Sequence, residues 1–245
     1  MTLLAFGLLV VAGFFAGLVG FVTGLASLVS YPALLAAGLS PVAANVTNTV
    51  ALVAAGVGAT TNASSEIAKD GRQLIRVGIV SAVGGLVGAI VLLTAPAGSF
   101  EAVVPFLVAF AAIALLLQPR LRNFAGTRKF PTLYPVALFF VAVYGGYFGA
   151  GAGVIFLALA LICTSDSIWR ASILKSFLLG IANLVAAIFF AFSGDVNWLA
   201  ALALAIGAFV GGYSGPPVVK VIPPNFLRLA VVFLGLGLAA WLQFA

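Results

Sequence analysis

The chain has 245 residues, of which 64% are hydrophobic and 7% are charged. Soluble domains carry charge on roughly a quarter of their residues, so this composition excludes a soluble protein and indicates an integral membrane protein. The formal net charge of +6 does not indicate a nucleic-acid-binding surface, because no soluble domain is expected to carry one, and the Lys and Arg residues are better explained as topology signals.

The first half of the chain opens with an apolar run, MTLLAFGLLVVAGFFAGLVGFV, which has no Lys or Arg before it and no convincing cleavage site. We therefore expect a retained membrane segment and not a cleaved signal peptide. The run begins a Gly-rich segment at about 3–38, and later apolar runs predict helices at about 41–61, 73–94 and 101–117. Strand-like alternation is absent from these runs, which favours helices.

A polar stretch, QPRLRNFAGTRKFPTLYP, separates the two halves of the chain. It contains Arg120, Arg122, Arg128 and Lys129, so the positive-inside rule predicts a basic cytoplasmic linker at 119–134. The second half then repeats the order of the first, with a Gly-rich segment and three predicted helices at about 135–164, 168–192, 198–219 and 226–244.

The two halves match each other at a constant offset of 127 in the numbering. At this offset, Gly84, Gly85 and Gly88 fall on Gly211, Gly212 and Gly215, and Pro96 falls on Pro223. Single matches mean little in a chain so rich in small residues, but a shared GGxxG with a Pro at the same spacing indicates duplication. The sequence predicts an all-α polytopic membrane protein with a first transmembrane repeat at 1–118 and a second at 135–245.

Two topologies fit this duplication. Eight crossings, four in each half, would make the halves parallel. If each Gly-rich segment instead re-enters, or crosses twice as two short helices, each half has about three full spanning helices and the halves are inverted. The inverted arrangement puts nearly all Lys and Arg residues on the cytoplasmic side, and we prefer it for that reason. Inverted repeats are typical of transporters with a substrate site near the midplane.

The stretch YGGYFGAGAGV, residues 144–154, has two interpretations. Gly145, Gly149 and Gly153 form GxxxG pairs, which would let helices approach closely. However, the glycines, with Gly151 among them, fall on several faces of a helix, which favours a broken backbone. At membrane depth a broken backbone must be buried or line a cavity, and free N–H groups at the start of a half-helix can bind an anion. The first half has a weaker version of this stretch, GLVGFVTGLAS.

A polar stripe follows each Gly-rich segment. In the second half, helical spacing puts Ser172, Lys175, Ser176 and Asn183 on one face, and in the first half Asn45, Asn48 and Thr49 lie at the equivalent place. Such residues also serve as interhelical hydrogen-bond donors and acceptors, so a purely structural role stays open.

Lys175 carries the strongest functional signal in this stripe. A charged side chain inside the membrane costs roughly 2.5–3.5 kcal/mol on insertion scales and generally faces a cavity or a partner. The alternative is a side chain that reaches the cytoplasmic surface, and Asp166 is the nearest acid in sequence. A cation with hydroxyls, amides and the backbone N–H groups of Gly149, Gly151 and Gly153 is suited to a small anion such as a sulfonate, sulfite or carboxylate.

Enzymatic chemistry is not expected. The chain has no His and one Cys, Cys163, so a disulfide within the chain and a cysteine-based metal cluster are excluded, and paired carboxylates for catalysis are absent. We therefore predict no catalytic residue, no metal and no cofactor. A channel-like facilitator and a non-transporting assembly subunit remain as alternatives to a transporter.

The stretch GGYFGAGAGVIFLALAL, followed by Ala171 and the polar helix and then by GGxxG and a Pro, resembles the TauE/SafE family of membrane transporters, also called sulfite exporters. The likeness covers about 3–244. Ala150 and Ala152 interrupt a glycine run that is denser in the family, and no Pro follows it, although the first half keeps Pro32.

This resemblance implies a multi-pass protein of the prokaryotic inner membrane that moves sulfite, an organosulfonate or a related anion. Alternating access between the halves would use a midplane site. The expected partners are the small anionic substrate and membrane lipid, with no nucleic acid, and homodimerisation is left open.

Overall fold

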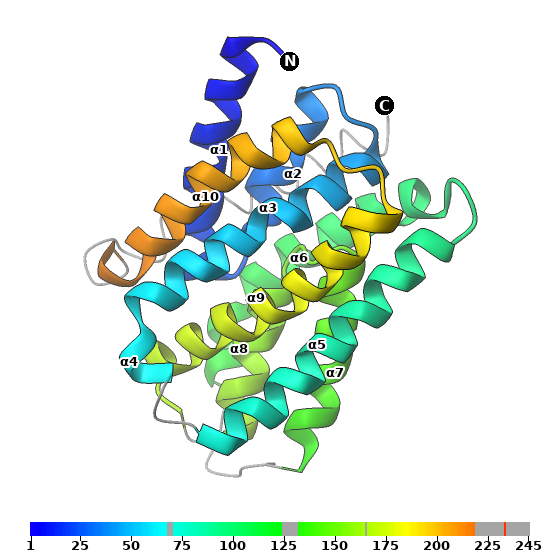
Figure 1. The fold of residues 1–245 in the computed structure, drawn as a ribbon. Helices are drawn as coiled ribbons and strands as arrows, with labels where there is room; N and C mark the ends of the chain where they lie inside the picture. Colours follow the sequence, from blue (N-terminus) through cyan, green and yellow to red (C-terminus); the bar gives the residue numbers. More distant parts are fainter. Residues whose placement is uncertain (68–70, 124–131, 165, 219–232, 234–245) are drawn as a thin grey trace.

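The computed structural model describes residues 1–67, 71–123, 132–164, 166–218 and 233. These residues form helices joined by short loops (Figure 1), and the helices are α1 (Leu3–Thr23), α2 (Ser27–Ala36), α3 (Pro41–Asn62), α4 (Ser64–Ile67), α5 (Gly71–Thr94), α6 (Ser99–Asn123), α7 (Leu133–Tyr147), α8 (Ala152–Cys163), α9 (Ile168–Ser193) and α10 (Trp198–Val218). The all-α architecture predicted from the sequence is confirmed for this part of the chain.

Several of these helices have the length and composition of membrane spans. In the described residues, five segments qualify, and they lie in α1, α3, α5, α9 and α10. Large apolar side chains point outward from them and from their neighbours, for example Phe192 with 88% of its surface exposed and Phe140 with 65%. Lipid tails can cover such side chains, so this surface suits a protein that crosses a bilayer several times.

The helix bounds recur through the chain. Helices α3 and α9 begin at Pro41 and Ile168, and α5 and α10 begin at Gly71 and Trp198, so both pairs of starts are related by the same offset of 127. In each half a short helix, α2 or α8, stands between the first helix and the long polar one. Helix α6 continues to Asn123, into the segment predicted as linker, and the helix predicted at 226–244 falls outside the described residues apart from position 233.

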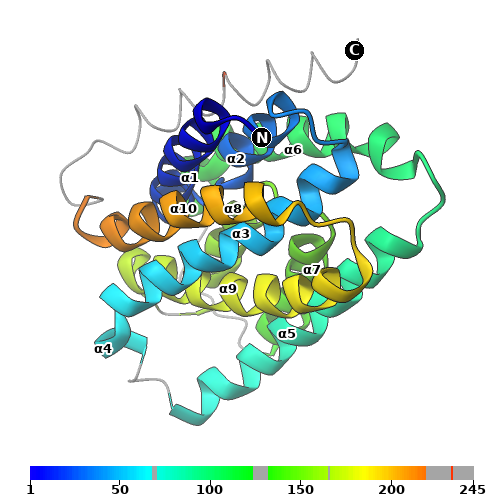
Figure 2. The ribbon, with the colours of Figure 1, turned by 45° about the horizontal axis from the view of Figure 1, so that its top comes forward.

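Four long helices form a layer through the middle of the molecule, in the order α10, α3, α9 and α5 (Figure 2). Helices α3 and α9 are antiparallel, because the N–H of Asn197, just after α9, donates to the hydroxyl of Thr47 near the start of α3 at 3.0 Å. At the opposite end, Ala63 after α3 belongs to the same buried cluster as Ile173 near the start of α9.

Each half sends its first helix to pack against the other half. Helix α1 packs along α10 and α7 packs along α5. These contacts are so close that a Cβ atom added to Gly13 would overlap the carbonyl oxygen of Leu204, and one added to Gly88 would overlap that of Val143. Small residues let membrane helices approach in this way without a hydrophobic driving force.

The glycines of the repeated GGxxG motif lie at equivalent contacts. A Cβ atom on Gly85 would overlap the carbonyl oxygen of Ala182, and one on Gly212 would overlap that of Ala55. The offset of 127 relates Gly85 to Gly212 and Ala55 to Ala182. The motif therefore marks the surfaces on which α5 and α10 meet the central helices.

Candidate functional site

The Gly-rich segments are helix breaks, and the two breaks touch each other. Helix α1 is followed by Gly24 with φ +85°, and between α7 and α8 Gly149 and Gly151 have φ of +77° and +79°. A Cβ atom on Gly24 would overlap the carbonyl carbon of Gly153. The left-handed backbone and the close approach both require glycine. A continuous GxxxG packing helix is thus not what this stretch forms.

A small cavity lies beside these breaks, with a volume of about 80 Å³. Its walls come from α1, α2, α3, α7, α8 and α9 and from the breaks between them. The polar side chains that line it are Ser27, Asn48, Thr49, Lys175, Ser176 and Asn183. Much of the remaining wall is glycine backbone, including Gly20, Gly24, Gly149 and Gly153.

Seven of the ten side chains and glycines predicted for a binding site line this cavity: Lys175, Ser176, Asn183, Asn48, Thr49, Gly149 and Gly153. Ser172, Asn45 and Gly151 are not part of its wall. Ser172 lies one turn away, where its carbonyl accepts the hydroxyl of Ser176 at 3.0 Å. Helical spacing puts the predicted side chains of each half on one stripe, but the cavity reaches only part of each stripe.

Lys175 is buried and capped by backbone. Its side chain is 1% exposed, and Nζ donates to Gly20 O at 3.0 Å and to Phe21 O at 2.7 Å. These carbonyls belong to the last turn of α1, where the helix dipole is negative and a cation is favourable. The ammonium also lies 5.8 Å from the centre of the Phe21 ring. The side chain does not reach the surface.

One ammonium donor of Lys175 is left for the cavity. An ammonium has three N–H groups, and in the described part of the chain its acceptors are those two carbonyls. Asp166, considered as its partner, instead lies 3.1 Å from Arg170 Nε and accepts from the hydroxyl of Thr164 at 2.8 Å. Lys175 therefore brings to the cavity a charge that no carboxylate of the described residues pairs with.

Asn48 is fixed by two serines of α2. Its Nδ2 donates to Ser27 Oγ at 3.1 Å, and its Oδ1 accepts from Ser30 Oγ at 2.5 Å. Thr49 donates to Asn45 O one turn back at 3.0 Å. Ser27 was not among the predicted site residues. The sequence signal for it was its position at the end of GLVGFVTGLAS, the weaker glycine stretch of the first half.

The predicted use of backbone N–H groups is wrong for Gly149. Its N–H donates to Tyr144 O at 3.0 Å, and the N–H of Ala152 donates to Gly149 O at 3.1 Å. What the breaks present to the cavity instead are the beginnings of two helices, with Ser27 starting α2 and Ala152 and Gly153 starting α8. The positive ends of two helix dipoles are therefore directed at this space.

The one charged side chain in the described wall of the cavity is that of Lys175, and no Asp or Glu is among the described residues that line it. The ends of α1 and α7 lie in the same wall as the starts of α2 and α8, and Lys175 caps the end of α1. An anion fits this arrangement, since N–H groups and the dipole at a helix start both favour negative charge.

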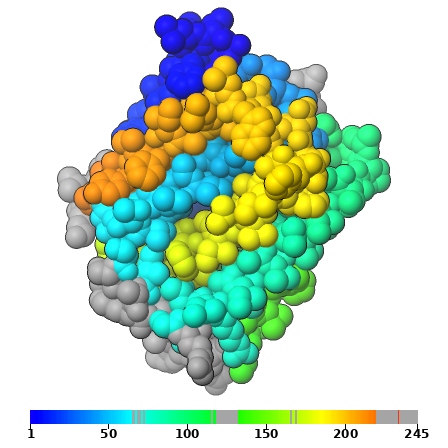
Figure 3. Space-filling view, viewed as in Figure 1, coloured from blue at the N-terminus to red at the C-terminus, as the bar shows by residue number. Residues whose placement is uncertain are grey.

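A second, apolar hollow adjoins the cavity. It has a volume of about 490 Å³ and lies between α3 and α9, where Figure 3 shows the surface hollowed between the cyan and yellow helices. Gly56 and Gly180 line both spaces, and a Cβ atom on Gly56 would lie 3.0 Å from Gly180 Cα. This glycine contact is the wall between the cavity and the outer hollow.

A multi-pass helical protein with a buried lysine in a central cavity has the architecture expected of a membrane transporter. Comparison of the sequence with known protein families identifies the family. The family described as Sulfite exporter TauE/SafE matches residues 9–242, and the chain belongs to this family. The resemblance noted from the sequence is thereby confirmed.

Curated relatives agree with this assignment. A probable membrane transporter protein ORF9 from Sinorhizobium sp is 26% identical over 97% of this chain and 91% of its own length. The probable membrane transporter protein YfcA of Escherichia coli is 26% identical over 98% of this chain and 90% of its own length. No solved structure matches the chain significantly. The protein is a member of a transporter family, with several membrane spans, in the bacterial membrane.

Proposed function

We propose that this protein carries a small, sulfur-containing oxyanion across the membrane through the central cavity. The observation that carries the proposal is the ammonium of Lys175, which is 1% exposed and faces no carboxylate among the described walls of the cavity. Burying a charge without a counter-ion is costly, so a site that retains one is suited to an anionic ligand. Family membership supports the sulfur chemistry, because its description is a sulfite exporter.

The family description favours sulfite as the first candidate substrate, with an organosulfonate as the second. The cavity that would bind it has a volume of about 80 Å³. In this site Lys175 would supply the charge, and Ser27 and Asn48 would orient the oxygens.

Alternating access between inverted repeats is the mechanism we infer for this transport. Three features support it: the helix starts repeat at a constant offset, α3 and α9 are antiparallel, and α1 and α7 each pack against the other half. The pairs α1–α2 and α7–α8, each broken at glycine beside the cavity, are suited to re-enter from opposite sides. Rocking of two such units around a fixed site would expose it to each side in turn.

Anion binding and flux test the function together. Purified protein should be stabilised against heating by sulfite more than by sulfate, isethionate or acetate at equal ionic strength. Proteoliposomes should take up labelled sulfite, and sulfite inside the vesicles should accelerate that uptake. Uptake without this acceleration would indicate a channel. If none of these anions stabilises the protein and none is taken up, the proposal is refuted.

A further inference from the structure

Two residues with an unpaired buried polar atom lie near the C-terminal end of α7. The hydroxyl of Tyr31 and Oδ1 of Asn45 have no hydrogen-bond partner in the described part of the chain, although both residues are 0% exposed. Buried polar atoms in proteins are nearly always satisfied, so each exception calls for a ligand or a bridging molecule.

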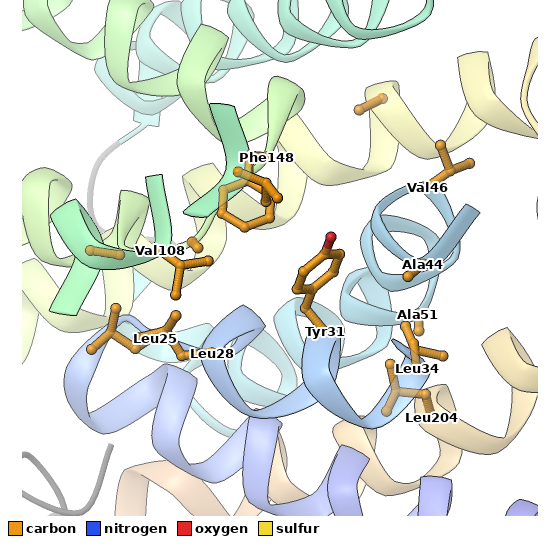
Figure 4. Close-up of a cluster of buried hydrophobic side chains, with 14 of the residues drawn as sticks. Leu25, Leu28, Tyr31, Leu34, Ala44, Val46, Ala51, Val108, Phe148 and Leu204 are labelled. Atoms are coloured by element: carbon orange, nitrogen blue, oxygen red, sulfur yellow. The ribbon is translucent and has the colours of Figure 1, made fainter. Parts of the chain in front are cut away.

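Both residues contact the same short segment, Tyr147–Phe148. Asn45 Nδ2 donates to Tyr147 O at 2.8 Å, which holds the Asn45 amide at the end of α7. The Tyr31 ring packs edge-on against the Phe148 ring, with 5.4 Å between centroids. Figure 4 shows the Tyr31 hydroxyl directed between Phe148 and the part of α3 that carries Ala44 and Val46, the neighbours of Asn45.

The equivalent place in the other half already contains a cation. At the offset of 127 between the halves, Gly20 and Phe21 correspond to Tyr147 and Phe148. The carbonyls of Gly20 and Phe21 accept from the ammonium of Lys175. At the end of α7, the described residues supply an amide donor from Asn45 to the first carbonyl of the pair but no charged group. The negative end of the α7 dipole is thus without the positive charge that α1 has.

We propose that a monovalent alkali cation binds at the end of α7, in contact with Asn45 Oδ1, the Tyr31 hydroxyl oxygen and the carbonyls of the Tyr147–Phe148 segment. These are oxygen ligands, which alkali cations require, and they include backbone carbonyls at the end of a half-helix. Because the ligands are neutral, a divalent ion, which takes carboxylates, is disfavoured. The site adjoins the anion cavity, whose walls include Phe148 but neither Asn45 nor Tyr31.

The surroundings also favour a cation. Phe100, near the start of α6, packs against the rings of both Tyr147 and Phe148, with centroids 5.8 and 5.6 Å apart. The next residue, Glu101, is exposed and lies in the first turn of α6. Its carboxylate is next in the chain to a residue that packs on both rings, and negative charge raises the local concentration of cations.

Melting of the purified protein in detergent tests this site without a transported oxyanion. We expect the melting temperature to rise and saturate with NaCl or KCl, measured against choline chloride at constant ionic strength and chloride, with the two salts distinguishing sodium from potassium. Equal melting temperatures in all three salts would overturn the proposal and leave a bridging water as the partner of the two atoms.

Tyr31→Phe provides the matched variant, because it removes the hydroxyl and keeps the ring on Phe148. It should raise the cation concentration for half-maximal stabilisation by about tenfold or more, the size expected for one lost contact to a charged group. Tyr213→Phe, at an exposed position on α10, should leave that concentration unchanged. If both variants keep the parent's cation response, the cation binds elsewhere. The anion experiments are separate, so either proposal can fail alone.

Discussion

Replacing Lys175 by Met separates the two roles of its ammonium. Met keeps an unbranched stem of similar length and removes the charge and the donors. Structurally, Gly20 O retains a partner, since the N–H of Gly24 donates to it at 2.9 Å. Phe21 O loses its charged partner, which is the cost of about one unsatisfied buried acceptor, roughly 1–3 kcal/mol.

A gain offsets this structural cost. The variant no longer places a charge inside the membrane, which insertion scales value at roughly 2.5–3.5 kcal/mol. The two effects nearly cancel, so we expect Lys175→Met to fold, with a melting temperature within a few degrees of the parent. Anion binding has no such compensation. Loss of one contact to a charged group costs roughly 1.5–3 kcal/mol, which weakens binding by about 10- to 150-fold.

The assay is sulfite binding by calorimetry, with uptake into proteoliposomes as the second readout. Lys175→Arg should restore part of the affinity because it keeps the charge. Arg76→Met is the matched control, since it removes a cation from an exposed position on α5 that does not line the cavity. A folded Lys175→Met protein that binds sulfite as the parent does would show that Lys175 only caps α1, and the anion site would be misassigned.

Two further predictions follow from the breaks and the polar stripe. Gly24→Ala should greatly lower the yield of folded protein on size exclusion, whereas Gly38→Ala should cost only about 1–2 kcal/mol of folding free energy. The backbone angle φ is positive at both glycines, but only Gly24 lies against backbone. Equal effects would contradict the role given to the contact between Gly24 and Gly153. Asn48→Asp should weaken sulfite binding by more than about 100-fold, because the two negative charges repel by roughly 4 kcal/mol at ~4 Å. Asn62→Asp, at the exposed end of α3, is the control and should leave the affinity unchanged. Retained affinity in Asn48→Asp would refute an anion bound next to Asn48.

The order and bounds of the helices could be predicted because the sequence signals for them are local or repeated. Helix starts at Pro41 and Gly71 recur at Ile168 and Trp198, so the offset found from glycines carried over to the helix bounds. The break at Gly149 was also predictable, since glycines on several faces of one helix serve no single contact. These features depend on spacing along the chain, which a sequence contains directly.

The partners of the site residues could not be predicted in the same way. Lys175 donates to backbone carbonyls of another helix, far away along the chain, and a carbonyl has no side-chain identity that a sequence pattern can reveal. Asp166 was nearer in sequence but is paired with Arg170 across one helical turn. Likewise, Asn45 and Asn48 share a helix face, yet only Asn48 lines the cavity, whereas Asn45 donates to the carbonyl of Tyr147 at the end of α7.

Duplication and chemistry make different demands on this chain. Close packing of α1 on α10 and of α7 on α5 needs small residues in both halves, and both halves have them. The positive charge at the cavity, by contrast, occurs in one half only. Lys175 corresponds to Asn48 at the offset of 127, so α9 carries an ammonium where α3 carries an amide. A second lysine at position 48 would bring two ammonium groups into about 80 Å³, where each would raise the cost of the other. The asymmetry between equivalent positions therefore supports a site for one anion, bound closer to α9 and the end of α1 than to α3.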